Sequence, residues 1–247
     1  GSYGGSMNLT TALVKSYNTV PVKLYLGRDN LKPLGGKKIE EIARRMGVSS
    51  PLVLNPPMVL GSNGLTVLEM AASYGTFMTG GMKLDPHSIL QVTDSSGNVL
   101  YDYRKDRPAP VRALSERTVG VMNRMMAQIP EWGTARRAAL DGIRVAGKTG
   151  TTSSYRDAWF VGYTGNYVGA VWYGNDDYTT MNKMTGGTVP AMTWQKFMTY
   201  AHQNIDLLPV PFIENPLPGG VQEKPEQPEG QEMVQGPPAM RPKLLSK

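Results

Sequence analysis

The sequence contains no cysteine and only two histidines, His87 and His202. The lack of cysteine excludes disulfide bonds, thiolate catalysis and thiolate metal ligands, although it does not identify the cellular compartment. With only two histidines, there are few candidate ligands for a zinc site and few candidates for a histidine general base. We expect both rings to be solvated or hydrogen-bonded. The composition therefore predicts neither a metal site nor a cofactor.

Long hydrophobic runs are also absent from this 247-residue chain. No stretch of about 18 apolar residues occurs, so no part of it is expected to cross a membrane. The opening residues, GSYGGSM, have neither the basic nor the apolar region of a signal peptide. Hydrophobic residues make up 40% of the chain and charged residues 19%, which is typical of one or two globular domains.

The formal net charge of +6 is unevenly placed, because residues 206–247 hold only four Lys and Arg against six Asp and Glu. A basic body can attract nucleic acid or an anionic polymer. No basic run interleaved with aromatics occurs, so we expect a solvated basic surface and no nucleic-acid partner. Residues 209–247 contain nine prolines, which indicates a disordered tail. The predicted division is therefore a folded domain over 3–205 and a tail over 206–247.

Hydrophobic periodicity predicts five helices. The clearest begins at Thr66, where Glu69 three residues later completes a capping box. In the helix that Ser115 caps, apolar residues recur on one face. The predicted helices cover residues 8–16, 37–47, 66–79, 116–129 and 189–204.

Strand-like runs fall into two groups. The first is a hairpin, residues 88–93 and 99–103, around the turn-rich stretch DSSGN. The second is a meander of three runs at 142–149, 157–164 and 167–174, whose last two runs are separated by the two-residue loop Gly165-Asn166. Together with the helices, these runs predict an α+β fold with an antiparallel sheet flanked by helices.

Residues 142–150 fit two catalytic signatures. Gly142 to Thr149 match the phosphate-binding pattern G-x-x-x-x-G-K-[ST], whereas Lys148 to Gly150 spell K-T-G. A phosphate loop needs a glycine-rich turn that leads into a helix. Here the intervening residues alternate like a strand, and the weakly helical TGTTSSYRD that follows leads into another strand-like run. The pattern favours K-T-G, and nucleotide hydrolysis remains the weaker alternative.

A second triplet strengthens the K-T-G reading. Ser16-Tyr17-Asn18 is an S-x-N motif, and the two motifs occur in this order in enzymes that react with β-lactams. The wider stretches SYNTVPVKL, LGSNGLTVLEMAASYGTFMTGG, AGKTGTTSSYRDAWFVGYTGNYVGAVWYGNDD and GGTVPA closely resemble the class A, bifunctional penicillin-binding proteins. The resemblance covers about residues 7–200 and leaves out the tail.

This resemblance implies a β-lactamase/transpeptidase-like fold and a peptidoglycan D,D-transpeptidase. Such enzymes acylate a serine with a D-Ala-D-Ala stem peptide and transfer the acyl group to an amine, and β-lactams mimic that substrate. By the same resemblance Ser16 and Lys148 are catalytic. The implied substrate-binding residues are Asn18, Lys148, Thr149, Gly150 and Thr151.

One departure from the family pattern is serious, because no serine here has a lysine three residues later, as S-x-x-K requires. In the family that motif lies N-terminal to S-x-N. The resemblance therefore implies an N-terminally truncated domain that does not form an acyl-enzyme by itself. The family's glycosyltransferase domain and membrane anchor would lie further upstream, at the periplasmic face of the inner membrane. The alternative is a non-catalytic module that binds cell-wall peptide or a partner protein.

Overall fold

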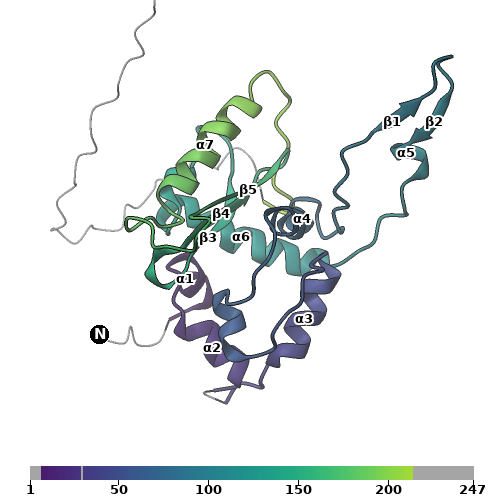
Figure 1. The fold of residues 1–247 in the computed structure, drawn as a ribbon. Coiled ribbons are helices and arrows are strands. Elements are labelled where there is room, and N and C mark those ends of the chain that lie inside the picture. The colour runs from purple at the N-terminus through teal and green to yellow at the C-terminus, as the bar shows by residue number, and fades with distance from the viewer. Residues whose placement is uncertain (1–6, 29, 214–247) are drawn as a thin grey trace, which may run out of the picture.

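The computed structural model describes residues 7–28 and 30–213, and Figure 1 shows their arrangement. Its α-helices are α1 (Leu9–Val14), α2 (Thr19–Leu26), α3 (Gly35–Arg45), α4 (Val67–Met78), α5 (Tyr103–Asp106), α6 (Glu116–Trp132) and α7 (Val189–Ala201). Its strands are β1 (Gln91–Thr93), β2 (Val99–Asp102), β3 (Ala146–Thr151), β4 (Asp157–Tyr163) and β5 (Val168–Gly174). Short 3₁₀ turns are η1 (Pro56–Leu60), η2 (Arg136–Ala138) and η3 (Ser153–Tyr155).

The central sheet has the strand order β3-β4-β5 and is antiparallel throughout. This confirms the predicted α+β fold and the three-strand meander. β3 lies at one edge of the sheet, so one side of its backbone has no strand neighbour. Lys148 on β3 pairs with Val161 on β4, and Gly150 pairs with Trp159.

Local signals set where the helices begin. The Asn8 side chain accepts a hydrogen bond from the Thr11 amide at 2.7 Å, and both bonds of the predicted capping box on α4 are present. The apolar run after Asn18, for which no element type was predicted, forms α2. Pro21 is tolerated there because amides in the first helical turn have no intrahelical acceptor.

The core lies on both faces of the central sheet (Figure 1). On one face, Trp194 of α7 packs edge-on against Phe160 of β4 and donates a hydrogen bond to a β5 carbonyl. On the other face, Tyr163 of β4 stacks on Phe77 of α4 and donates to Asn123 of α6 at 2.6 Å. Successive β4 side chains point to opposite faces, so one strand anchors helices on both sides.

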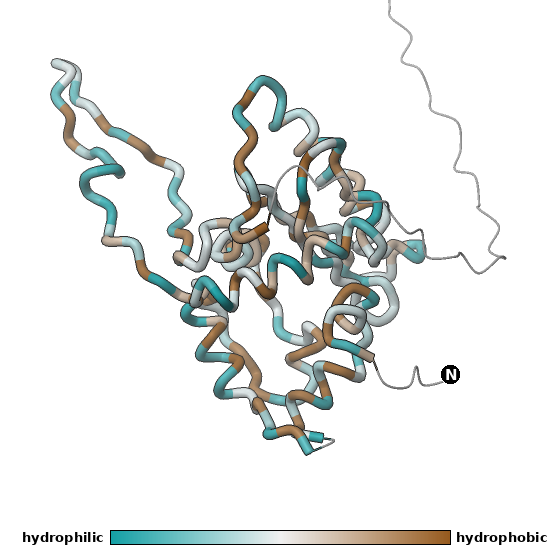
Figure 2. The backbone as a smooth tube through the Cα atoms, turned by 180° about the vertical axis from the view of Figure 1, so that it is seen from behind, coloured by the Kyte–Doolittle hydropathy of each residue, from teal (hydrophilic) through white to brown (hydrophobic). Residues whose placement is uncertain are grey.

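The hairpin β1–β2 forms a separate sheet that projects from the body together with α5 (Figure 1). Hydrophobic residues also occur along this arm (Figure 2), and Val92, Val99 and Leu100 are exposed on it. The hairpin was predicted from its turn, whereas its separation from the central sheet was not.

Residues 206–213, which the sequence assigns to the tail, pack against the body. Val210 is buried, and the Pro211 carbonyl accepts a hydrogen bond from Asn123 at 2.9 Å. Residues 214–247 lie outside the described residues, so the disordered tail stays a prediction there. In the part of the chain that the structure describes, no helix combines the length and the apolar character that a membrane crossing needs.

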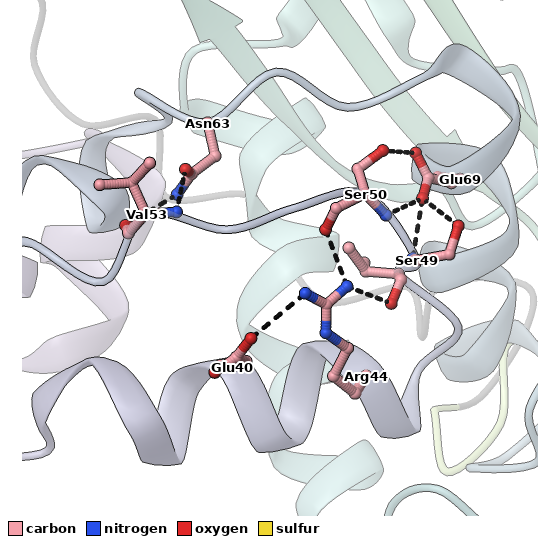
Figure 3. A network of polar contacts seen from close by, with 8 residues as sticks. Glu40, Arg44, Ser49, Ser50, Val53, Asn63 and Glu69 are labelled. Carbon is pink, nitrogen blue, oxygen red and sulfur yellow. Dashed lines mark hydrogen bonds and ion pairs between the residues drawn. The ribbon is translucent and has the colours of Figure 1, made fainter.

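Glu69 connects the start of α4 to the loop after α3, as Figure 3 shows. Its carboxylate accepts hydrogen bonds from the amides and hydroxyls of Ser49 and Ser50 at 2.6–2.8 Å, and also from the Thr66 amide. These bonds, those of Ser50 first, hold the pKa of Glu69 well below its usual value. Arg44 of α3 binds the same loop through the Ser50 carbonyl.

We predict that Glu69→Ala lowers the free energy of unfolding by about 1–2 kcal/mol at pH 7, because the helix cap and the loop contacts are lost together. A carboxyl whose pKa is lowered by folding stabilises the protein above its unfolded value of 4.5. That contribution declines as the pH falls below 4.5, so it is already smaller at pH 3, and it is fully lost below the folded value. Urea unfolding at pH 7 and pH 3 measures both effects, with exposed Glu41→Ala as control. A difference between wild type and variant that is the same at both pH values would contradict this account.

Candidate functional site

Strand β3 carries the K-T-G motif along the open edge of the central sheet. The backbone stays extended through Thr151, and no α-helix begins at Lys148 or Thr149, so the phosphate-loop interpretation is wrong. The predicted start of this strand at Gly142 is also wrong, because β3 begins at Ala146. Gly142 has a φ of +66° and forms a turn instead, closed by a bridge between Leu140 and Ile143.

Ser16 lies just beyond α1, next to the lysine of β3. The Lys148 ammonium donates to the Ser16 hydroxyl at 2.7 Å and to the Thr149 carbonyl at 3.1 Å. Ser16 has a φ of +56°, a backbone conformation that is uncommon for a residue other than glycine. The structure therefore brings together two motif residues that are 132 positions apart in the sequence.

Burial changes the acidity of the lysine. Lys148 is half-buried, and desolvation of its ammonium lowers its pKa from 10.5 to about 8. The charged form predominates below pH 8 and the neutral amine above it. A lysine of this kind can both hold an anion and exchange a proton near neutral pH.

Asn18 lies two residues beyond Ser16, at the start of α2. Its side chain is exposed, and among the described residues it makes no hydrogen bond to Ser16 or Lys148. It lines a mostly apolar groove of about 570 Å³. The other residues of this groove are Thr19, Val22, Lys23, Leu26, Arg28 and Leu60.

The far end of β3 is held by the segment that precedes α7. The Gly186 amide donates to the Thr151 hydroxyl at 3.0 Å. A Cβ on Gly186 would lie 2.0 Å from the Trp159 carbonyl oxygen and 2.6 Å from that of Gly150, so only glycine fits there. Residues 186–188 belong to the stretch GGTVPA, for which the sequence predicted no role in the site.

Thr134 was not identified from the sequence. Its hydroxyl lies 2.6 Å from that of Thr149, so a residue just beyond α6 reaches the K-T-G strand. A threonine after a helix carries no local signal of such a contact.

The arrangement combines one ammonium group, several hydroxyls and an unpaired strand edge. The Thr152 amide donates to Asp157 on β4. Because amides alternate in direction along a strand, the amides of Thr149 and Thr151 face the open edge. The site is suited to an extended peptide that bears a carboxylate. Within 7–28 and 30–213, no cluster of three or more His, Cys, Asp or Glu could hold a metal ion.

Comparison with known proteins places this geometry in context. Residues 1–199 match the family model described as the penicillin binding protein transpeptidase domain. Penicillin-binding protein 1A of Neisseria meningitidis serogroup A is 33% identical over 207 residues, and penicillin-binding protein 4 of Bacillus subtilis is 32% identical over 204. These alignments cover 81% and 80% of the chain but only 25% and 31% of the two relatives. The chain thus spans about a quarter to a third of their length.

Solved structures show the same fold. PonA1 of Mycobacterium tuberculosis, in complex with penicillin V, superposes with a TM-score of 0.74 at 24% identity. That match covers 85% of this chain and 60% of the other. Penicillin-binding protein 1A of Haemophilus influenzae gives a TM-score of 0.72 at 23% identity, covering 85% of this chain and 37% of the other.

We predict that the Lys148 amine titrates near pH 8, whereas exposed lysines titrate near 10.4. Competitive acetylation of the chain over pH 6.5–11, read by mass spectrometry, measures each titration midpoint. Lys196, which is exposed on α7, is the internal control. A Lys148 midpoint equal to that of Lys196 would show that the ammonium is fully hydrated.

Proposed function

The chain belongs to the family of penicillin-binding protein transpeptidase domains, and on that premise we propose that it supplies two of the three motifs of a peptidoglycan D,D-transpeptidase. The observation that carries this proposal is the 2.7 Å hydrogen bond from Lys148 to Ser16 beside the open edge of β3. The third motif, S-x-x-K, does not occur in the sequence. We therefore infer that this chain alone forms no acyl-enzyme.

The stem peptide binds along β3 as an added strand. Gly150 leaves room for it because it has no side chain. Lys148, with the hydroxyls of Thr149 and Thr151, holds the terminal carboxylate, and Asn18 bonds a backbone amide of the substrate. The Thr151 amide faces the open edge and stabilises the oxyanion, a contribution whose loss typically costs about 2.7–4 kcal/mol.

The reaction proceeds in two acyl transfers. The nucleophilic serine of the S-x-x-K segment attacks the carbonyl carbon of the penultimate D-alanine, and the lysine of the same segment takes up its proton as the new ester bond forms. Ser16, in contact with the Lys148 ammonium, delivers a proton to the departing D-alanine nitrogen as the peptide bond breaks. An amine of a neighbouring strand then attacks the ester carbonyl carbon, so that a new amide bond forms, the ester bond breaks and the proton lost by the amine returns to the serine oxygen. β-Lactams enter the first step and remain attached.

The complete gene product would work where its substrate is, at the periplasmic face of the inner membrane, with a membrane anchor outside this chain. Its partners would be peptidoglycan stem peptides and β-lactams, without a cofactor. A second candidate is a non-catalytic module that binds cell-wall peptide or a partner protein, and it would be favoured if the complete gene product also lacks S-x-x-K.

Labelling with a fluorescent penicillin tests the proposal. We expect the complete gene product to be labelled covalently and the 247-residue chain not to be. In the complete product, Ser16→Ala and Lys148→Ala should each slow labelling at least tenfold. The first variant removes the hydroxyl that delivers the proton, and the second removes the ammonium that contacts it. Lys196→Ala, an exposed change on α7, is the matched control.

The other outcomes are equally informative. Covalent labelling of the 247-residue chain would mean that the nucleophile lies within it, against the proposal. An unlabelled complete product that still binds penicillin reversibly would support the non-catalytic module.

A further inference from the structure

The segment Trp132-Gly133-Thr134 lies where α6 ends, and it contacts both motif-bearing parts of the site. The end of α1, which leads to Ser16, lies on one side of it, and β3 lies on the other. None of these three residues belongs to a motif identified in the sequence. We call them the 132–134 segment.

On the α1 side the contact is close. The Lys15 ammonium donates to the Trp132 carbonyl at 3.3 Å and lies 5.2 Å from the centroid of its ring. A Cβ on Gly133 would lie 2.7 Å from both the carbonyl oxygen and the Cγ1 of Val14. Val14 is fully buried and cannot move aside freely. The end of α1 is therefore seated against α6 at a distance that only glycine allows.

On the β3 side the contact is polar. The Thr134 hydroxyl lies 2.6 Å from the Thr149 hydroxyl. The Thr134 carbonyl oxygen lies 2.1 Å from where a Cβ on Gly187 would be. Thr134 thus touches the K-T-G strand with its side chain and the segment before α7 with its backbone.

We propose that the 132–134 segment positions both halves of the site. Gly133 and Trp132 set how far Ser16 lies from Lys148. Thr134 donates its hydroxyl hydrogen to the Thr149 oxygen, which leaves the Thr149 hydrogen free to point at a substrate carboxylate. The first role follows from packing alone, and the second rests on the function proposed above.

The first role is tested in the 247-residue chain through the titration of Lys148. Gly133→Ala should push α1 away from α6, admit water to the ammonium and move its midpoint upward from about 8. Gly64→Ala is the control, because a Cβ there meets nothing within 4 Å. Circular dichroism establishes that each variant is folded.

If Gly133→Ala fails to fold, a second variant still tests the first role. Lys15→Met removes the contacts with Trp132 without adding atoms to the packed interface, and we expect a smaller shift in the same direction. An unchanged midpoint in the folded variants would overturn the first role.

The second role is tested in the complete gene product with a penicillin and its methyl ester. Thr134→Val should slow acylation by the free acid about tenfold, the scale of one hydrogen bond that assists a charged group. Acylation by the ester should not change, because the ester lacks the carboxylate that Thr149 binds. Thr134→Ser keeps the hydroxyl and should stay within about twofold of wild type.

A double variant closes the comparison. Thr134→Val combined with Thr149→Val should be no slower than Thr149→Val alone, because Thr134 acts through Thr149. Equal losses with acid and ester, or no loss with either, would overturn this role. An unlabelled wild type would instead refute the proposed function, and the lysine titration would still decide the first role.

Discussion

The hydrogen bond between Lys148 and Ser16 is the contact on which the rest of the site depends. A half-buried ammonium is unfavourable unless acceptors replace the water it has lost. The protein supplies two acceptors, the Ser16 hydroxyl and the Thr149 carbonyl. The Ser16 hydroxyl lies 132 positions from Lys148 in the sequence. The site therefore exists only when α1, α6 and β3 are assembled. Desolvation then lowers the pKa of Lys148 to about 8, where an amine is useful for proton transfer.

The second constraint is the open edge of β3. Proteins usually protect such edges, because an unpaired strand invites pairing with another chain. Here the charged Lys148 lies on the edge strand, and the Gly186 amide donates to the Thr151 hydroxyl near the end of that strand. An edge kept open beside an ammonium group is the expected arrangement for a site that adds a peptide strand. Glycine is needed at 186 for a separate reason, because a Cβ there would lie 2.0 Å from the Trp159 carbonyl oxygen and 2.6 Å from that of Gly150.

Much of the fold could be predicted because its signals are local. The capping box of Thr66 and Glu69 and the loop Gly165-Asn166 involve residues a few positions apart, and both formed as expected. The errors also have physical reasons. The side chains of residues 142–145 alternate in character as in a strand. However, Gly142 has a positive φ and forms a turn, so β3 begins only at Ala146. The hairpin β1–β2 was predicted, but no local pattern says which sheet a hairpin joins.

Some features of the candidate site were likewise predictable from the sequence, and others were not. The sequence by itself determined which residue types stand in the S-x-N and K-T-G motifs and in which order, and the wider stretches around them indicated the family. Tertiary structure alone decided that Ser16 adopts a left-handed backbone conformation and accepts the Lys148 bond. It also decided that Thr134 reaches Thr149. These contacts join residues that are distant in sequence, and their geometry comes from how helices and sheet pack, which no pattern of neighbouring residues encodes.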